Sequence, residues 1–232
     1  MAEDPRAFSR ALWRRLVQLL GTLVIFAVFY FGAVGRIDAW RGWVWIGASF
    51  VLTAINGVIV LRVNPEIVAA RSRRGPATRG FDKVVMTIWT VGYLATPLVA
   101  GLQDRLGSGL LAGGWTVAGL ALLAIGMAPI SWSMAVNRHL ETTVRIQEDR
   151  GHRVVDSGPY RWVRHPMYVG VLVQTIATPA TLGSTWALVP TLGVLVALVT
   201  RTALEDRTLR AELPGYAEYA NRTRWRLLPG IW

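Results

Sequence analysis

The chain has 232 residues, of which 53% are hydrophobic and 17% are charged. Ordinary soluble domains carry roughly 25% charged residues, so this composition argues against a water-soluble globular protein. The sequence contains no cysteine, which excludes a disulfide framework, a thiolate nucleophile and a cysteine-ligated zinc site. A net charge of +11 is common in nucleic-acid-binding proteins, but here the charges lie between apolar segments, so we expect no nucleic-acid partner.

Five long segments without a charged residue follow one another along the chain. Segments 16–34, 42–61, 84–102 and 106–137 contain 19, 20, 19 and 32 residues. About 20 apolar residues cross the hydrocarbon core as a helix, so each of these segments predicts one transmembrane helix. A fifth uncharged segment, 167–200, contains 34 residues. Because only helices and closed barrels satisfy their backbone hydrogen bonds in lipid, we predict an all-α, polytopic transmembrane bundle.

The basic residues are distributed unequally between the two sides of this predicted bundle. If the N-terminus lies inside and each of the first four segments crosses once, 22 of the 25 basic residues lie inside. The three outside are Arg36, Arg41 and Arg105. The positive-inside rule then places both termini and the segments 62–83 and 138–164 in the cytoplasm. Only one of the basic residues, Lys83, is a lysine, which favours a GC-rich bacterial genome and hence the bacterial cytoplasmic membrane.

The fifth apolar segment is expected to be a helical hairpin. It is flanked by Arg164 on one side and Arg201 on the other, so it must return to the side from which it started. Proline, glycine and serine cluster at 179–184, which predicts the turn. Each arm then has about 14 to 16 residues and is roughly 21 to 24 Å long, shorter than the ~30 Å core. We therefore predict four full spans followed by a C-terminal hairpin that crosses incompletely or leans on its neighbours.

The chain thus divides into two expected parts. Residues 1–140 form the four spans, with the cytoplasmic loop 62–83 between the second and third. Residues 141–232 form the second part, which contains the hairpin and the cytoplasmic tail.

The segment 145–170, which joins the fourth span to the hairpin, is dense in hydrogen-bond donors, aromatic rings and turn-forming residues. Gly158-Pro159 and His165-Pro166 both interrupt a continuous helix. Taken singly, its residues fit a solvated loop. Taken together, they favour a folded surface that binds a polar, planar, charged ligand. A metal site is the alternative, but the three histidines, His139, His152 and His165, are spaced 13 residues apart, which matches no common ligand pattern.

Arg201 and Glu205 follow the hairpin and lie four residues apart, on one face of a helix. One interpretation is an interfacial ion pair in which the arginine reaches the lipid headgroups. The other is that both residues take part in a site, because the hairpin returns Arg201 to the membrane face that carries the segment 145–170.

Several motifs in the last two fifths of the chain resemble the isoprenylcysteine carboxyl methyltransferase family and the related phospholipid methyltransferases. They occur in the family's order and spacing over residues 145–232. The matching elements are Gln147, Gly151-His152-Arg153-Val154-Val155, Ser157-Gly158-Pro159-Tyr160, Arg164-His165-Pro166-Met167-Tyr168-Val169-Gly170, Arg201, Glu205-Asp206, Leu209, Gly215-Tyr216, Tyr219 and Arg226-Leu227-Leu228-Pro229. A softer match upstream runs from Asn64-Pro65-Glu66 through Arg71 to Phe81-Asp82-Lys83.

This resemblance implies S-adenosylmethionine as the methyl donor, bound at the cytoplasmic face. It also implies that residues 141–232 are the cofactor-binding catalytic region. It also implies a cofactor pocket lined by Gln147, His152, Arg153, Val154, Val155, Tyr160, His165, Pro166, Met167, Tyr168 and Glu205. Arg201 would face the methyl acceptor, so that Arg201 and Glu205 are the candidate catalytic residues. The sequence departs from the family in two places: Asp206 stands where the family often repeats glutamate, and Gln147 lies closer to His152 than in some eukaryotic relatives.

Four functions remain open at this level. The first is carboxyl O-methylation of a lipophilic, isoprenoid-like acceptor by a membrane methyltransferase. The second is N-methylation of a phospholipid amine, in which case Arg201 would grip phosphate. The third is an NADPH-dependent membrane sterol or enone reductase, whose C-terminal region is distantly similar. The fourth is a non-catalytic membrane scaffold.

Overall fold

The computed structural model describes residues 5–72 and 79–232, and within these two ranges the chain forms helices, turns and loops but no strand. The predicted all-α class is therefore confirmed. Part of the predicted loop 62–83, residues 73–78, lies outside the described residues. The elements in chain order are α1 (Pro5–Val34), α2 (Trp40–Val63), α3 (Glu66–Arg71), α4 (Gly80–Arg105), α5 (Gly113–Val136), η1 (Glu148–Arg150), η2 (Gly158–Arg161), α6 (Pro166–Leu182), α7 (Leu188–Glu212) and α8 (Tyr216–Arg222).

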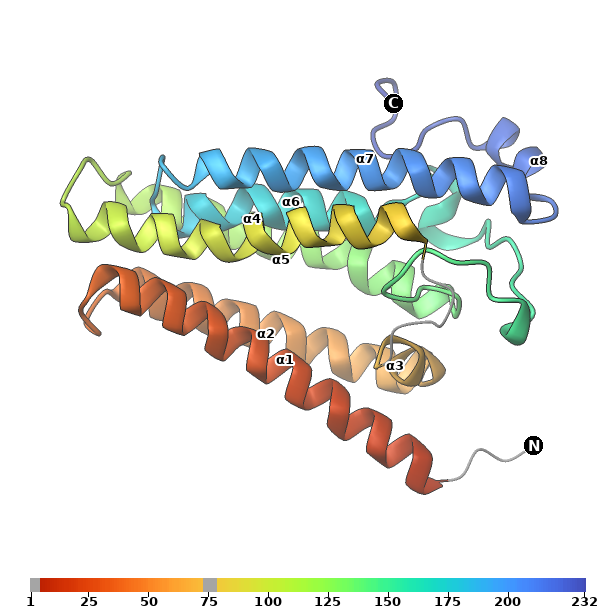
Figure 1. Ribbon diagram of the computed structural model, residues 1–232, viewed down its shortest axis with the longest axis horizontal. Coiled ribbons are helices and arrows are strands. Elements are labelled where there is room, and N and C mark those ends of the chain that lie inside the picture. The colour runs from red at the N-terminus through yellow and green to blue at the C-terminus, as the bar shows by residue number, and fades with distance from the viewer. Residues whose placement is uncertain (1–4, 73–78) are drawn as a thin grey trace.

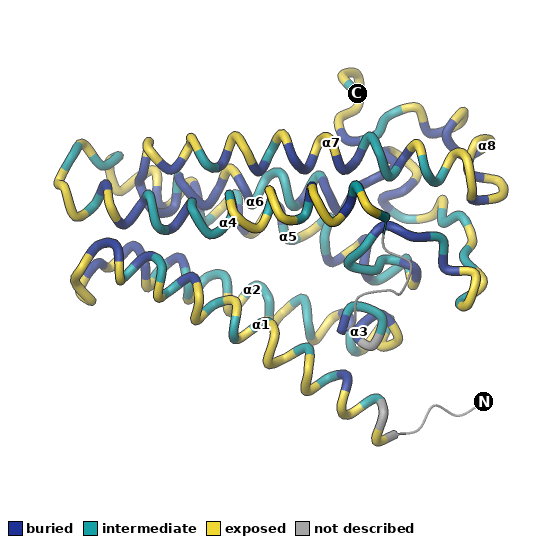
Figure 2. The backbone as a smooth tube through the Cα atoms, in the orientation of Figure 1, coloured by how far each residue is buried: buried dark blue, intermediate teal, exposed yellow. Residues whose placement is uncertain are grey.

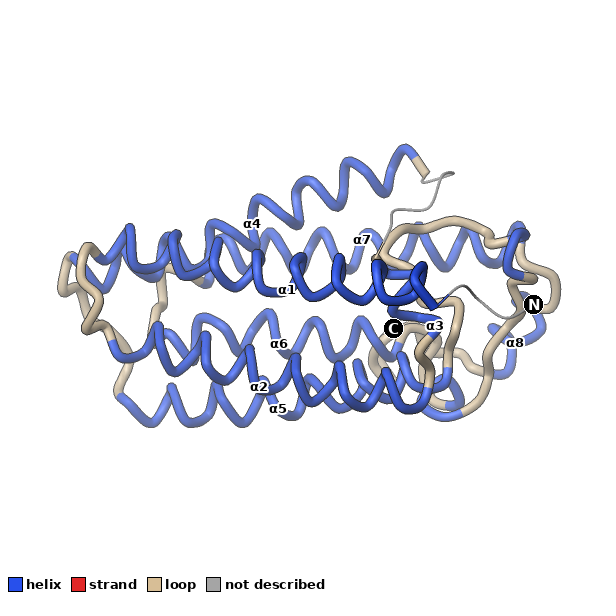
Figure 3. Tube along the Cα trace, turned by 90° about the horizontal axis from the view of Figure 1, so that it is seen from below, coloured by secondary structure: helices blue, strands red, loops and turns tan. Residues whose placement is uncertain are grey.

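The long helices run back and forth along one axis, and short turns alternate with long connections (Figure 1). The start of α1, the helices α3 and α8 and the connection 137–165 all gather at one end of the bundle (Figures 1 and 3). These are the segments that the charge distribution assigns to one side of the membrane, so the alternation predicted from the sequence agrees with the fold. We call this end the loop end.

Within the described part of the chain, five helices are long and apolar enough to cross a membrane: α1, α2, α4, α5 and α7. The hairpin turn follows α6 at Gly183, which ends that helix with a φ of 67°, and it lies within the predicted region. The first arm, α6, has 17 residues and is about 25 Å long, close to the expectation. The second arm is longer than expected: α7 has 25 residues, or roughly 37 Å, because the helix continues beyond Arg201, where the uncharged segment ends.

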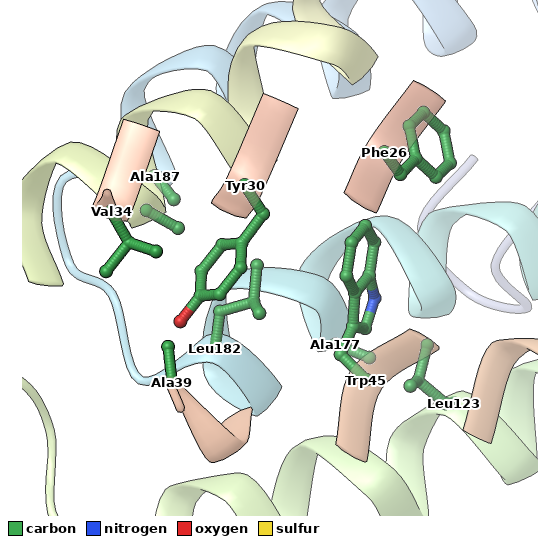
Figure 4. Packing of buried hydrophobic residues seen from close by; sticks show 10 residues of the cluster. Phe26, Tyr30, Val34, Ala39, Trp45, Leu123, Ala177, Leu182 and Ala187 are labelled. Carbon is green, nitrogen blue, oxygen red and sulfur yellow. The ribbon is translucent and has the colours of Figure 1, made fainter. Parts of the chain in front are cut away.

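Buried and exposed positions alternate along the long helices (Figure 2). The cluster of buried residues in Figure 4 consists of aromatic, aliphatic and small side chains. Tyr30 of α1 is fully buried and packs with Trp45 of α2 and Leu182 of α6 in one cluster. The Tyr30 hydroxyl donates a hydrogen bond to Asp104 at 3.0 Å. This cluster fixes α1 and α2 against the hairpin, which in turn fixes where the hairpin's loop-end residues lie.

Helices α5 and α6 approach each other through glycines. A Cβ atom at Gly170 would lie 2.3 Å from the carbonyl oxygen of Gly126, and one at Gly126 would lie 2.8 Å from the carbonyl oxygen of Gly170. At Gly119, a Cβ would lie 2.4 Å from the backbone nitrogen of Thr181. Backbone thus packs on backbone here, which leaves no room for a side chain.

Replacing Gly170 with alanine should therefore push α5 and α6 apart. We expect a loss of about 1–3 kcal/mol from overpacking, measured as a lower melting temperature of the detergent-purified protein. The matched control is Gly193→Ala in α7, where a Cβ would meet nothing within 4 Å; alanine's helix propensity should leave that variant neutral or slightly stabilised. Equal melting temperatures for the two variants would contradict the close packing.

Candidate active site

A cavity at the loop end is formed by residues that come before and after the hairpin. Its walls come from the connection 137–165, the first turn of α6, the last turns of α7 and the helix α8. We call it the polar cavity. Every residue that the sequence assigns to the site lines it except Pro166. Pro166 is buried and begins α6 directly after His165.

The connection 137–165 is folded, in contrast to a solvated loop. Gln147 is 2% exposed, and its side-chain amide donates to the carbonyl of His139 at 2.6 Å. Its side-chain carbonyl accepts from Arg150 at 3.0 Å, and its backbone carbonyl accepts from the His152 amide at 3.1 Å. Gly151 permits this tight turn with a φ of 56°. These bonds place His139 and His152 with ring centroids 4.8 Å apart.

Glu141 and Arg145 form a second clamp within the connection. Both carboxylate oxygens of Glu141 accept from the Arg145 guanidinium at 2.7 Å, and Asp149 accepts from the same guanidinium at 2.7 Å. A bidentate pair of this kind is stronger and more directional than a single hydrogen bond. The clamp therefore fixes the wall of the cavity on which Gln147 lies.

A chain of polar contacts joins α4, α7 and α6, and three of its four residues line the polar cavity. Arg201 donates from Nε to Asp82 at 2.7 Å and from Nη1 to the Tyr168 hydroxyl at 2.7 Å. That hydroxyl donates in turn to Glu205 at 2.5 Å. Asp82 is fully buried, and its other oxygen accepts from the Val144 amide at 3.0 Å. We call these four residues, Asp82, Arg201, Tyr168 and Glu205, the Arg201 hydrogen-bond chain.

The Arg201 hydrogen-bond chain differs from the direct ion pair between Arg201 and Glu205 that their spacing in the sequence allows. Among the described residues, no ion pair joins these two side chains directly; Tyr168 lies between them. Arg201 also donates to the carbonyl of Thr142 at 2.9 Å. Because a guanidinium has five N–H groups and three are engaged, two remain for another partner.

Asp206 is the residue whose role sequence reasoning missed most clearly. It is fully buried and accepts from Arg164 at 2.7 and 3.2 Å, from the Tyr216 hydroxyl at 3.0 Å and from Arg226 at 3.0 Å. Arg164 also donates to the carbonyls of Thr223 and Arg224. Asp206 therefore ties the start of the hairpin and the C-terminal tail to α7. Its position one residue after Glu205 marked it only as a departure from the family pattern.

Burial keeps the histidine pair of the polar cavity neutral. It is the main cause that lowers the pKa of His152 to about 4, and the neighbouring His139 and the charges of Arg145 and Arg150 contribute to the same shift. The pKa of His139 is also lowered, chiefly by burial and then by Arg138 and Arg150. Burial raises the pKa of Tyr160 as well, whose hydroxyl accepts from Asn137 at 3.1 Å. Near pH 7 these groups act as neutral hydrogen-bonding partners.

A second cavity lies on the other side of Arg201, among α1, α4, α6 and α7. We call it the apolar cavity because most of its lining is aromatic or aliphatic, including Phe26, Trp89 and Tyr93. Four residues line both cavities, and they form a shared wall. They are Glu141, Met167, Tyr168 and Arg201.

Replacing Asp206 with asparagine should leave Arg164 without its counter-charge and release the C-terminal tail. Removing one partner of a buried ion pair costs about 3–5 kcal/mol, so we expect a lower melting temperature and faster tryptic cleavage after residue 213. The matched control is Asp156→Asn, which breaks the exposed pair of Asp156 with Arg222 and should cost less than about 1 kcal/mol. Unchanged tail protection in the Asp206 variant would contradict this role.

The low pKa of His152 predicts a pH-dependent contribution to stability. In the unfolded chain a histidine has a pKa of about 6.5, so on acidification the unfolded state binds this proton first. The stability contributed by neutral His152 is complete above pH 6.5 and is lost as the pH falls towards 4. The melting temperature of the wild type, compared with that of His152→Gln, should therefore drop selectively between these values. A difference that stays constant across this range would show that His152 titrates normally.

Comparison with known proteins agrees with the resemblance seen in the sequence. The family model of the isoprenylcysteine carboxyl methyltransferase (ICMT) family matches residues 118–211. The cobalt-zinc-cadmium resistance protein CzcN of Cupriavidus metallidurans is 34% identical over 111 residues, which cover 44% of this chain and 47% of CzcN. The matched part of the chain thus spans about half the length of this relative.

The fold as a whole is similar to a solved structure of the eukaryotic intramembrane Ras methyltransferase ICMT. The two share a TM-score of 0.53 and 18% sequence identity, over 94% of this chain and 77% of that one. At this identity the likeness concerns the fold. The resemblance is thereby confirmed: residues 118–211 carry the pattern of the isoprenylcysteine carboxyl methyltransferase family, on a fold that the chain shares with a solved ICMT.

Proposed function

We propose that this protein is an S-adenosylmethionine-dependent membrane methyltransferase that methylates the carboxylate of a lipophilic, isoprenoid-like acceptor. The observation that carries the proposal is the meeting of the two cavities at one wall. A polar cavity and an apolar cavity share Glu141, Met167, Tyr168 and Arg201. Because this wall separates a polar cavity from an apolar one, it suits a reaction between a polar, charged donor and an apolar acceptor.

The residues of the polar cavity fit the donor in three respects. Buried His139 Nδ1 and Thr143 Oγ1 line it and have no hydrogen-bond partner within the described chain, so they are free to bind the donor's polar groups. Glu205 supplies a negative charge for a cationic ligand. Val154, Leu209 and Leu213 supply an apolar surface for a planar ring.

We infer that the donor is held by the residues that the resemblance implies and that the polar cavity gathers. They are Gln147, His152, Arg153, Val154, Val155, Tyr160, His165, Met167, Tyr168 and Glu205. Pro166 would contribute indirectly, by starting α6 so that His165 and Met167 face the cavity. When bound, S-adenosylmethionine supplies a methyl group made electrophilic by its sulfonium.

The protein's part in the reaction is alignment. A carboxylate acceptor is already an anion, so no residue has to act as a general base. Arg201 would hold the acceptor with its two remaining N–H groups while Asp82 and Tyr168 fix its position. Holding an oxygen in line with the methyl carbon is an orientation effect worth several kcal/mol. Glu205, fixed by Tyr168, would hold the donor's positive charge on the opposite side of the wall.

The architecture gives the two substrates separate routes. We infer that the acceptor enters the apolar cavity from the bilayer and that the donor enters the polar cavity from the cytoplasm. The loop end carries most of the basic residues, and the positive-inside rule places such an end in the cytoplasm.

The direct test incubates the purified protein with methyl-labelled S-adenosylmethionine and a fractionated bacterial lipid extract. The account predicts label in an apolar product that releases methanol on mild alkaline treatment, as a methyl ester does. Label in an alkali-stable methylamine would show that the acceptor is an amine and would contradict the proposed carboxylate. Binding of NADPH in place of S-adenosylhomocysteine would contradict the methyltransferase proposal.

Replacing Glu205 with glutamine removes the charge proposed to face the donor but keeps the side-chain volume. We expect S-adenosylmethionine to bind at least about tenfold more weakly, or about 1.4 kcal/mol, in calorimetry of the purified protein. The control is Glu218→Gln, which removes an exposed charge from α8 and should leave the affinity unchanged. Equal affinities for the two variants would remove Glu205 from the donor site.

A further inference from the structure

The apolar cavity contains more positive charge than its apolar lining requires. Three arginines line it: Arg15 from α1, Arg71 from the last turn of α3 and Arg201 from α7. The acidic residue in its lining is Glu141, and Asp82 lies directly behind Arg201. A hydrocarbon chain alone gives no reason to place three guanidinium groups around one cavity, because burying a charge without a partner is costly.

Both nearby carboxylates are already engaged. Asp82 accepts from Arg201 and from the Val144 amide, and both oxygens of Glu141 accept from Arg145. Arg15 and Arg71 therefore have no counter-ion: within residues 5–72 and 79–232, neither forms an ion pair with a carboxylate. Arg201 is neutralised by Asp82, so the uncompensated charge of the apolar cavity belongs to Arg15 and Arg71.

Arg71 lies beside the wall that the two cavities share. Its Nη1 is 3.9 Å from the sulfur of Met167, a residue of that wall. The same nitrogen donates to the carbonyls of Leu140 at 3.1 Å and Glu141 at 3.3 Å. Its Nε is buried and has no partner in the described chain. The guanidinium is thus held in place by part of its donors, and the others stay available.

The electrostatic environment of Arg71 agrees with a missing anion. Burial is the main cause that lowers its pKa to about 10, and the charges of Arg15 and Arg201 contribute to the same shift. The group remains protonated near pH 7, so the cost of burying its charge is present in the folded protein. A negatively charged ligand would offset this cost, and a neutral or cationic ligand would not.

We propose that Arg71, assisted by Arg15, binds the carboxylate of the acceptor and so makes the protein prefer an acid to a neutral lipid with the same chain. This inference rests on the proposed methyltransferase function and adds an acceptor-binding residue from α3 to it. Arg15 lies on α1, the helix that packs beside α3. Its neighbour Gln18, one turn further along α1, accepts a weak hydrogen bond from Arg15 at 3.4 Å and donates to the backbone carbonyl of Ser72 at 3.2 Å. The contact from Gln18 to Ser72 ties α1 to the end of α3 and keeps both arginines on the same cavity.

The test compares the binding of two probes that share an isoprenoid chain: farnesoic acid, which carries a carboxylate, and farnesol, which carries a hydroxyl. Wild-type protein should prefer the acid. Arg71→Gln should weaken the binding of farnesoic acid at least about tenfold and leave the binding of farnesol unchanged. Arg71→Lys, which keeps the charge, should retain most of the preference for the acid. Arg62→Gln is the matched control, because Arg62 is an exposed arginine at the end of α2 outside the cavity lining.

Binding of S-adenosylhomocysteine to each variant serves as the check on folding and on the donor site. If the Arg71→Gln variant no longer binds S-adenosylhomocysteine, Arg15→Gln is used in its place, because Arg15 makes weaker contacts within the protein. The Arg15→Gln variant should also show a lower preference for the acid. Equal weakening of acid and alcohol, or no preference in the wild type, would overturn the inference. Preference for the acid without S-adenosylhomocysteine binding would support the anion subsite and overturn the proposed donor.

Discussion

The buried ion pair between Asp82 and Arg201 is the constraint on which the rest of the site depends. It joins the first turn of α4 to the last turns of α7 at an N–O distance of 2.7 Å, and Asp82 also accepts from the Val144 amide of the connection 137–165. Leaving either charge buried without the other would be costly, so the pair fixes three segments relative to one another. Tyr168 and Glu205 then take their positions from Arg201.

The acidic residues near the site divide into two kinds. Asp82 and Asp206 are fully buried, and each is neutralised by arginines from other parts of the chain. They hold segments together. Glu205 differs because its hydrogen bond, among the described residues, comes from the neutral hydroxyl of Tyr168. Its charge is therefore available to a ligand, as the charge of Arg71 is on the other side of the wall. In the proposed reaction, the negative charge would face the donor and the positive charge would face the acceptor.

Much of this organisation was predictable from the sequence. Uncharged segments and the bias of basic residues gave the alternation of the helices, and the clustered proline, glycine and serine gave the turn near Gly183. The length of α7 was underestimated, because a charged residue ends an apolar segment but does not end a helix. The partners of Arg201 and Asp206 were not predictable: Asp82 is 119 positions away in the sequence, and no spacing rule connects residues that meet only when separate helices pack. The sequence offered one signal for Asp82: it lies within the softer upstream match to the family.

In the proposed site, segments on both sides of the hairpin together bind the donor. Photolabelling with an azido-adenosine analogue of S-adenosylmethionine, followed by mapping of the labelled peptides, tests this most directly. The account predicts label on the connection 137–165 and on the end of α7 or α8, with both signals abolished by excess S-adenosylhomocysteine. Label confined to one side of the hairpin, or label that S-adenosylhomocysteine does not displace, would contradict it.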